Sequence, residues 1–464
     1  MTDAPIRPNS LEARDIATIL HPYTNLKLHE SDGPLVVTRG QGVRVYDNED
    51  REYIEGMAGL WCTALGFGEE RLVEAAAAEM RKLPFYHQFT HKSHDTGIDL
   101  AERLLGLAPV PMSKAFFANS GSEANDTAVK LVWYLNNAVD RPERKKIISR
   151  VKAYHGVTVA SASLTGLPKN HEDFDLPIAG ILHTVCPHHY RFAEAGEGEE
   201  EFATRCAENL RQMIEDEGPE TIAAFIAEPI MGAGGVIVPP KTYFEKIQAV
   251  LAEYEILFIV DEVITGFGRT GNLWGSQTFK LKPDMMTMAK ALTSAYLPMS
   301  AVLVSDPIYK TLVKESEKVG VFAHGYTYSG HPVPSAVALE TLKIYEERDI
   351  VGHVRQVMGR FQARLKALGD RDFIGETRGT GLIGAVELVK DRNSKAMFDP
   401  PGKVGAQVAK FAQSHGLIVR AIMDSVAFSP PLVITEDEID EMFDRFELAL
   451  KDTQDWIAGE GLAA

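Results

Sequence analysis

The 464-residue sequence has few cysteines, and their arrangement does not suggest a cross-link. Its three cysteines, Cys62, Cys186 and Cys206, are an odd number with no CxxC spacing. Small disulfide-bonded domains and structural zinc sites need paired or closely spaced cysteines. The sequence therefore argues against both and favours a protein that works in a reducing compartment.

Basic charge and long apolar runs are also scarce. The formal net charge of -17 at pH 7 opposes binding to nucleic acid or to an anionic membrane. No apolar stretch is long enough to span a bilayer, and the first residues, MTDAPIRPNSLEARD, lack the apolar core of a signal peptide. We therefore expect a cytosolic (cytoplasmic) protein whose partners are small molecules, with no nucleic acid and no membrane. The glycosylation sequon at Asn125-Asp126-Thr127 is then accidental.

Between about residues 60 and 330, short β-branched runs alternate with helical patterns, which predicts a mostly parallel α/β sheet covered on both faces. The expected strands lie within residues 145–150, 221–229, 256–263 and 300–305. The segment ILFIVDEV is apolar on successive residues, which is typical of a strand buried on both sides. It ends in Asp261-Glu262, and ligands of such sheets bind beyond the carboxyl ends of strands. These carboxylates are therefore site candidates.

From about residue 332 onward the pattern changes to long helices separated by short strands such as TGLIGAVELV and GLIVRAI. This change predicts a second, smaller α+β unit, which the first sixty residues could join. We expect a large domain over residues 61–331 and a small domain formed by residues 1–60 and 332–464.

One lysine, Lys290, lies in the apolar run PDMMTMAKALTSAYLPMS with no acidic residue next to it. A surface lysine whose aliphatic stem covers apolar neighbours would explain it. A desolvated amine with a lowered pKa, able to form a Schiff base, would explain it as well. The residue alone does not decide between the two.

At residues 116–135 the sequence FFANSGSEANDTAVKLVWYL runs from a strand end through Ser120-Gly121-Ser122 into an amphipathic helix. Free N–H groups at a helix start, flanked by small residues, favour a bound phosphate. A serine that only caps the helix would produce the same pattern.

Two other motifs resemble a dinucleotide site and a metal site but lack the features that these sites need. GFGRTG at 266–271 matches the dinucleotide pattern GxGxxG, but DEVIT separates it from the preceding strand and no helix is expected to begin at its last glycine. His87 and His91 have the spacing of a metal pair, yet neither they nor the HTVCPHH run at 183–189 has further ligands at fixed spacing. We expect no metal site.

The remaining features occur together as pyridoxal 5′-phosphate (PLP) requires. The phosphate needs a helix start, the pyridine ring needs an aromatic cover such as Tyr154 in AYHG, and its nitrogen needs a carboxylate such as Asp261. The aldehyde needs an amine, and Lys290 follows Asp261 in the chain. The order of these residues along the chain and their placement at strand ends favour a PLP enzyme.

The chain resembles the class III, fold-type I PLP-dependent aminotransferases, and most of all their omega-amine:pyruvate branch. The resemblance rests on AGLWC (58–62), SGSEAND (120–126), AYHG (153–156), AEPIMGAGG (227–235), VDEVITGFGRTG (260–271), MAKALTS (288–294), HGYTYSGHP (324–332), LIVRA (417–421) and SPPLVIT (429–435). It implies the α/β PLP-dependent transferase fold of type I, with a mostly parallel sheet in the large domain. It also implies a homodimer, possibly a tetramer, with active sites at the subunit interface.

The resemblance also implies residue roles. Lys290 corresponds to the Schiff-base lysine and Asp261 to the partner of the ring nitrogen. The other cofactor-binding residues would be Ser120, Gly121, Ser122, Tyr154, His155, Glu228, Val263 and, from the neighbouring subunit, Thr327. The substrate pocket would be shaped by Trp61, Tyr23, Tyr154, Ala233, Arg420 and, from the partner chain, Phe89.

Physical chemistry supports several of these roles. A charged Asp261 would keep the ring nitrogen cationic, and the freed Lys290 amine could move a proton as base and acid. The planar fork of Arg420 suits a substrate carboxylate. Arg420 could instead be a surface residue at a strand end, although its neighbours Ile418, Val419 and Ile422 suggest burial.

We expect a transaminase that moves the amino group of a primary amine, one without an α-carboxylate, to pyruvate by a ping-pong mechanism. The alternative is a diamine, 4-aminobutyrate or β-alanine transaminase of the same class. A decarboxylase or mutase that uses PLP, and a non-catalytic binding protein, are less favoured. Tyr23 stands where many relatives have Phe, and Met231 and Ala233 also vary among relatives. The identity of the amine therefore follows least from the resemblance.

Overall fold

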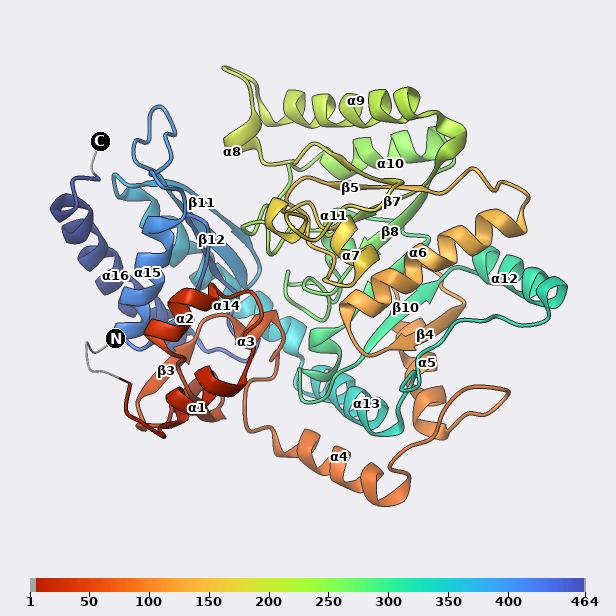
Figure 1. The fold of residues 1–464 in the computed structure, drawn as a ribbon, viewed down its shortest axis with the longest axis horizontal. Helices are drawn as coiled ribbons and strands as arrows, with labels where there is room; N and C mark the ends of the chain where they lie inside the picture. Colours follow the sequence, from red (N-terminus) through yellow and green to blue (C-terminus); the bar gives the residue numbers. More distant parts are fainter. Residues whose placement is uncertain (1–5, 463–464) are drawn as a thin grey trace.

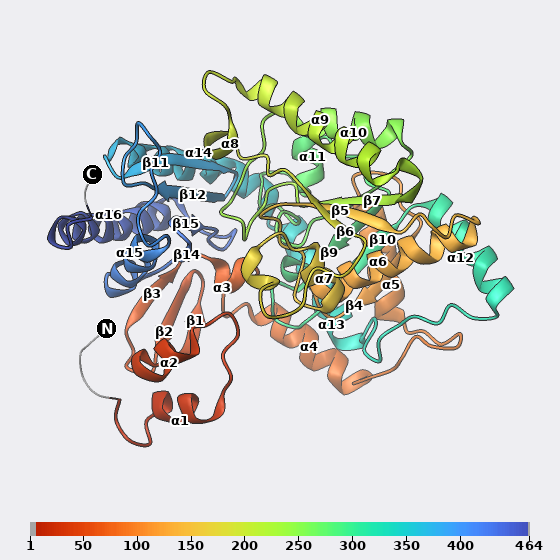
Figure 2. The ribbon, with the colours of Figure 1, turned by 45° about the horizontal axis from the view of Figure 1, so that its top comes forward.

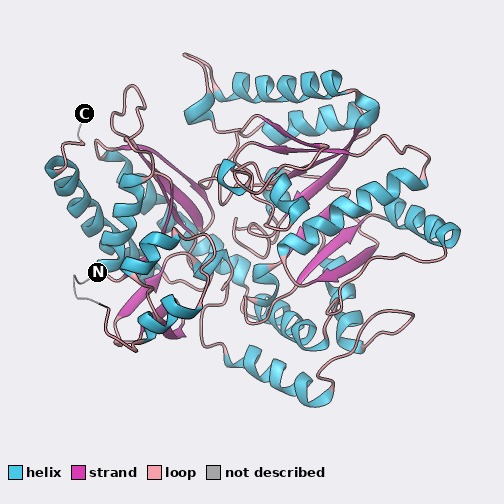
Figure 3. Ribbon diagram, viewed as in Figure 1, coloured by secondary structure: helices cyan, strands magenta, loops and turns pink. Residues whose placement is uncertain are grey.

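A computed structural model describes residues 6–462 of the chain. Figure 1 and the turned view in Figure 2 show a large body built around a central sheet and a smaller body that contains the first and the last of the described residues. The colouring in Figure 3 shows helices on the outside of both bodies and the main sheet inside the larger one.

The central sheet has seven strands in the order β4-β10-β9-β8-β7-β5-β6. Only β10 runs antiparallel to its two neighbours, β4 and β9, so the predicted mostly parallel sheet is confirmed. The strands are β4 (Lys114–Ala118), β5 (Lys146–Arg150), β6 (Ile181–Thr184), β7 (Ile222–Ala227), β8 (Leu257–Asp261), β9 (Met285–Met288) and β10 (Ser300–Val304).

Helices cover both faces of this sheet because its inner strands are apolar on successive residues. Phe258 and Val260 of β8 pack in the cluster with α9 and α10, whereas Ile259 packs with α6 on the other face. The helices of this body are α4 (Glu70–Lys82), α5 (Asp95–Leu107), α6 (Gly121–Ala138), α7 (Val159–Leu164), α8 (His189–Phe192), α9 (Glu199–Glu217), α10 (Tyr243–Glu253), α11 (Gly275–Phe279), α12 (Asp306–Val319) and α13 (Pro332–Glu347).

The smaller body contains two four-stranded sheets, with orders β1-β2-β3-β13 and β11-β12-β15-β14. Its strands are β1 (Val37–Gln41), β2 (Arg44–Asp47), β3 (Glu52–Glu55), β11 (Ile374–Thr380), β12 (Ile383–Leu388), β13 (Leu417–Ile418), β14 (Arg420–Ile422) and β15 (Ser425–Phe428). Its helices are α1 (Leu11–Thr18), α2 (Leu26–Asp32), α3 (Ala58–Trp61), α14 (Ile350–Ala367), α15 (Lys403–Ser414) and α16 (Glu436–Gly459).

The first sixty residues join the C-terminal part through a strand pair. Leu417 of β13 lies opposite Ile54 of β3 in a parallel ladder. The red and blue segments meet there in Figure 2. Helix α13, which follows residue 331, packs mainly on α4 and α5 of the larger body. The exact domain limits, 61–331 against 1–60 and 332–464, remain a prediction.

Two exclusions from the sequence can be compared with the structure. The GFGRTG motif lies in turns after β8, and α11 begins only at Gly275, so the strand and helix of a dinucleotide site do not flank it. Within residues 6–462, no helix combines the length and apolar character needed to cross a membrane. The three cysteines are free thiols.

Candidate active site

The start of α6 faces the end of β8 across a very small gap. Gly121 is the first residue of α6, and a Cβ atom built on it would lie 3.2 Å from both Cγ1 and Cγ2 of Val263. Ser120 is the N-cap, where its Oγ accepts the Glu123 N–H at 3.2 Å. Ser122 Oγ instead accepts the Val157 N–H at 3.1 Å. The structure therefore has both the serine that caps the helix and the small residue at the helix start that a bound phosphate needs.

Asp261 ends β8 as a buried carboxylate held by three donors. Its Oδ2 accepts from Asn125 Nδ2 and lies 2.8 Å from His155 Nδ1, and its Oδ1 accepts the Val263 N–H at 3.1 Å. The Asn125 bond is also 2.8 Å long. These contacts fix the carboxylate at the carboxyl end of the sheet.

Asn125 is a site residue that sequence reasoning missed. Its side chain is 1% exposed and donates to both Asp261 Oδ2 and the His155 carbonyl, at 2.8 and 2.6 Å. In the sequence, Asn125 belongs to an accidental sequon and to the motif SGSEAND, and neither indicated a role for it. Its position four residues after Gly121, one helical turn along α6, is the signal that could have placed it beside the site.

Glu262, the second candidate carboxylate after β8, has a structural role. Its Oε1 accepts from the Ser276 N–H and its Oε2 from Thr265 Oγ1, both at 2.6 Å. Burial raises the pKa of this carboxyl group. Glu262 therefore ties α11 to the end of β8, and only Asp261 is directed toward α6 and His155.

Glu228 and Tyr154 are hydrogen-bonded at the carboxyl end of the same sheet. Glu228, which follows β7, is 3% exposed, and its Oε1 accepts the Tyr154 N–H at 3.0 Å. Its Oε2 accepts the Gly232 N–H at 3.1 Å. Burial raises the pKa of Glu228, and burial likewise raises that of the Tyr154 phenol. Glu228 thus positions the main chain that carries Tyr154 and His155.

Lys290 begins a short 3₁₀ turn, Lys290–Thr293, directly after β9. Its φ of 49° lies in the left-handed region, which a residue with a side chain rarely adopts. Burial lowers the pKa of its ammonium, and the nearby Cys62, Asp261 and Glu228 oppose this effect. Lys290 is half-buried, and its lowered pKa favours the desolvated amine over a surface lysine.

Arg420, on β14, lies near the two tyrosines expected to line the pocket. The rings of Tyr23 and Tyr154 are 6.4 Å apart in an edge-to-face arrangement. Burial lowers the pKa of Arg420, whereas Tyr154 and Tyr23 act in the opposite direction. Within residues 6–462, no carboxylate forms a salt bridge with Arg420, although the smaller body contains many ion-paired arginines. Arg420 is half-buried, so it is not a freely exposed arginine at a strand end.

The other expected pocket residues differ in exposure. Trp61 is 2% exposed and packs with Met57, Ile230 and Ile264, while Ala233 is half-buried in the turn after Gly232. Tyr23 is 62% exposed and accepts a hydrogen bond from Asn170. Trp61 therefore contributes little open surface in the single chain.

Phe89 and Thr327 are both exposed in the single chain. Thr327 is exposed in the turn before Gly330, and Phe89 is 44% exposed with its ring against Gly325. The residue before this turn, Tyr326, donates from its hydroxyl to the Glu123 carbonyl of α6. The single chain thus presents both residues outward, where a second subunit could contact them.

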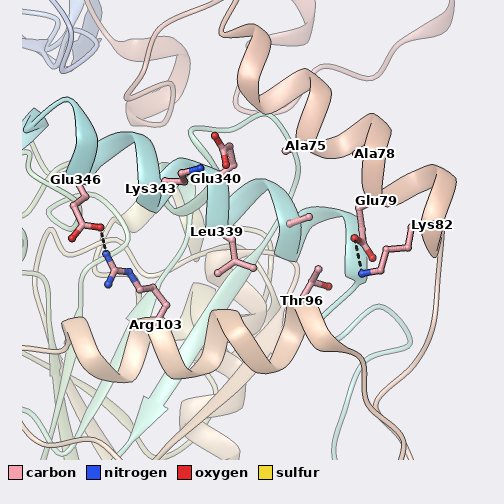
Figure 4. Close-up of a pocket in the computed structure, with 11 residues that line it drawn as sticks. Ala75, Ala78, Glu79, Lys82, Thr96, Arg103, Leu339, Glu340, Lys343 and Glu346 are labelled. Atoms are coloured by element: carbon pink, nitrogen blue, oxygen red, sulfur yellow. Dashed lines mark hydrogen bonds and ion pairs between the residues drawn. The ribbon is translucent and has the colours of Figure 1, made fainter.

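A separate groove lies between α4, α5 and α13, with a volume of about 570 Å³. Figure 4 shows its charged rim, where Lys82 pairs with Glu79 and Arg103 pairs with Glu346. None of the expected site residues lines it. The candidate site is therefore the edge of the sheet around Asp261 and Lys290.

A parallel sheet whose β8 ends in a buried carboxylate, beside a glycine helix start and a desolvated lysine, defines a PLP-dependent enzyme of fold type I. The family model of class III aminotransferases matches residues 27–450. The chain therefore belongs to the class III aminotransferases, as the motifs predicted.

Similar proteins include some named gamma-aminobutyrate transaminases and others named omega transaminases. A chloroplastic gamma aminobutyrate transaminase 3 from Solanum lycopersicum is 51% identical, over 97% of this chain and 88% of its own. A mitochondrial gamma-aminobutyrate transaminase 1 from Oryza sativa subsp. japonica is 53% identical, over 95% and 86%. A crystal structure of the omega transaminase from Pseudomonas jessenii in complex with PMP is 57% identical, with a TM-score of 0.96 over 97% of this chain and 99% of that one.

Class III aminotransferases use PLP, and the residues of this chain fit that cofactor. The missing Cβ of Gly121 leaves space where an added methyl group would press on Val263. The buried Asp261 carboxylate, fixed by Asn125 and His155, can face a cationic ring nitrogen, and Lys290 is an amine with a lowered pKa. The fit thus includes the phosphate, the ring and the aldehyde.

Proposed function

We propose that this transaminase moves the amino group of a primary amine without an α-carboxylate to pyruvate, in two half-reactions. The supporting observation is Arg420, a half-buried cation beside Tyr23 and Tyr154 that forms no salt bridge within residues 6–462. One cation can bind the carboxylate of a keto acid. An amine without a carboxylate needs no second cation, and aromatic side chains can receive its apolar part.

The cofactor would be held by elements that meet at the end of β8. The main chain of Ser120, Gly121 and Ser122 at the start of α6 would bind the phosphate, helped by Thr327 of the partner subunit. Tyr154 and Val263 would each cover one face of the ring. His155 would hold the Asp261 carboxylate in place, and Glu228 would hold the main chain of Tyr154. Lys290 would bind the aldehyde carbon through Nζ.

When bound, the cofactor supplies an electron-poor ring that accepts the electron pair released when a substrate Cα–H bond breaks. Asp261 favours the protonated ring nitrogen, since its carboxylate is fixed and buried. Lys290 Nζ would act as the base that takes the proton from the substrate Cα and as the acid that later gives it up. Because burial lowers the pKa of this amine, a larger fraction is neutral and able to act as a base.

The spacing of three residues in an engineered relative also supports the amine interpretation. One solved omega transaminase was engineered for enantiopure bulky amines by replacing a tryptophan, a phenylalanine and an arginine, which are 28 and 331 positions apart. Trp61, Phe89 and Arg420 have the same separations in this chain. We propose that these three residues shape the substrate pocket here, with Phe89 supplied by the partner subunit.

The second candidate is a 4-aminobutyrate transaminase, because several relatives carry that name. In that case Arg420 would bind a carboxylate in both half-reactions, first that of the amino donor and then that of the keto acid. In the amine case it would bind a carboxylate only in the second. This difference makes Arg420 the residue with which to separate the two candidates.

The test measures each half-reaction separately with the cofactor-loaded enzyme. The visible absorption band should decrease with 1-phenylethylamine and return with pyruvate. Arg420→Leu should leave the phenylethylamine step nearly unchanged and slow the pyruvate step by about 10²-fold, equivalent to losing charge-assisted hydrogen bonds of roughly 3 kcal/mol. Rapid reaction with 4-aminobutyrate, slowed equally by Arg420→Leu, together with no response to phenylethylamine, would favour the second candidate.

A further inference from the structure

Two histidines and an aspartate converge in the N-terminal segment, outside the candidate active site. Asp15 lies on α1, His29 on α2, and His21 in the connection between these helices. His21 Nε2 is 2.7 Å and His29 Nε2 is 3.1 Å from the same atom, Asp15 Oδ1. The side chains are 26%, 9% and 17% exposed for His21, His29 and Asp15, so water can still enter.

A comparison within the protein shows what is unusual about this cluster. His188, Glu376 and Glu387 also lie close together, but Arg378 donates to both carboxylates, at 2.7 and 2.6 Å. That second cluster already contains its cation. In contrast, within residues 6–462, no arginine or lysine side chain bonds to Asp15, and its carboxylate contacts only the two imidazoles.

From this arrangement we propose that Asp15, His21 and His29 bind one Zn²⁺ ion, with water completing the coordination. The three ligand atoms lie within 4.8 Å of one another. Zinc bonds of ~2.0–2.1 Å in a tetrahedral site separate the ligand atoms by ~3.3 Å. The contacts of 2.7 and 3.1 Å therefore need to open by only a few tenths of an ångström. Two neutral imidazoles and one carboxylate are ligands that zinc accepts.

The ion would fix a segment that reaches the substrate pocket. His21 and His29 enclose the residues around Tyr23, whose backbone φ of 50° is left-handed and whose ring lies 6.4 Å from that of Tyr154. Zinc would join α1, the connecting segment and α2 through side chains on all three. It would thereby hold Tyr23 at the pocket, independently of which amine the enzyme uses.

Zinc binding is measured by equilibrium dialysis of chelator-treated, cofactor-loaded enzyme, with the bound metal counted per chain. We expect one saturable equivalent per chain and visible d–d bands when Co²⁺ replaces Zn²⁺. His29→Gln and Asp15→Asn should each lose that equivalent. A wild-type protein with no stoichiometric zinc, or variants that retain it, would overturn the proposal.

The matched control is a variant that removes a histidine–aspartate contact outside the proposed zinc site. His415 Nε2 lies 2.7 Å from Asp452 Oδ2 without a second histidine, so His415→Gln should keep the zinc equivalent. Zinc should raise the melting temperature of the wild type and of His415→Gln but not of His29→Gln. If His29→Gln fails to fold, Asp15→Asn serves as the second variant.

Amide hydrogen exchange tests the proposed effect on the pocket. Zinc should slow exchange across residues 19–25 in the wild type and leave it unchanged in His29→Gln. Unchanged exchange in a wild-type protein that holds one zinc would show that the ion does not fix the Tyr23 segment.

Discussion

At the scale of single residues, Lys290 combines features that are unfavourable for stability but useful for chemistry. Its ammonium is desolvated, and within residues 6–462 no hydrogen bond holds Nζ. Its φ of 49° costs on the order of 1–3 kcal/mol for a residue with a side chain. Such strain persists only where the surrounding structure imposes it, and it is concentrated at functional sites.

Lys290→Met should therefore abolish turnover and stabilise the cofactor-free protein. Loss of the base alone lowers rates by roughly 10²–10⁴-fold, and the attachment point is lost as well. The folded-state pKa of Lys290 lies below its usual value of 10.5, so the charged amine destabilises the fold at neutral pH. This cost is full below the lowered pKa and disappears as the pH rises toward 10.5.

Thermal melts of the cofactor-free proteins at neutral and high pH check this expectation. The stabilisation by Lys290→Met should be largest at neutral pH and smaller near pH 10. The exposed Lys451→Met on α16 is the control and should show no such dependence. A Lys290→Met enzyme that retained a tenth of its turnover would remove Lys290 from the proposed role.

At the scale of elements, α6 brings the phosphate end and the ring end of the proposed site together. Gly121 opens the helix beside Val263, and Asn125, one turn later, bonds to Asp261. Further along the same face of α6, Ala128 and Val132 pack in the core against the sheet. One helix therefore sets the distance between the phosphate position and the carboxylate.

Gly121→Ala should weaken cofactor binding without unfolding the protein. Its backbone lies outside the left-handed region, so alanine is tolerated, but its Cβ would press on the Val263 methyl groups at 3.2 Å. Overpacking of this kind costs about 1–3 kcal/mol, so we expect the PLP dissociation constant to rise roughly 5- to 150-fold. Val263→Ala in the same chain should recover part of the loss.

Gly106→Ala on α5 is the matched control for this substitution. Gly106 is also helical, but nothing lies within 4 Å of the added Cβ. It should leave cofactor affinity unchanged and raise stability by up to ~1 kcal/mol. Equal affinities of Gly121→Ala and wild-type protein in PLP titrations would contradict the proposed phosphate site.

The elements also show how far local sequence patterns reach. Strand β8 and helix α6 were expected because apolar runs and small residues at a helix start are local signals. The Asn125 to Asp261 bond joins residues 136 positions apart, and no local pattern indicates it. The cluster of Asp15, His21 and His29 likewise depends on how α1 and α2 pack, so the histidine spacing did not predict it.

At the scale of the whole molecule, an exposed aromatic surface remains on the single chain. It consists of Phe85, Tyr86, Phe89 and Tyr328, which are 38–57% exposed. Phe85 and Tyr328 contact edge to face, with ring centroids 5.7 Å apart. Exposed aromatic groups of this kind mark interaction surfaces. Because Phe89 and Thr327 lie on this surface, we propose that a second copy of the chain covers it.

The proposed homodimer predicts that association and activity are lost together. In light scattering the protein should have twice the chain mass of 51.1 kDa. Tyr328→Glu places a charge in the proposed interface, so it should shift the protein toward monomer and reduce turnover, since Phe89 and Thr327 of the partner subunit would be missing. Leu448→Glu on α16, at a similarly exposed apolar position, should change neither property. An active monomer, in the wild type or in Tyr328→Glu, would mean that each chain completes its own site.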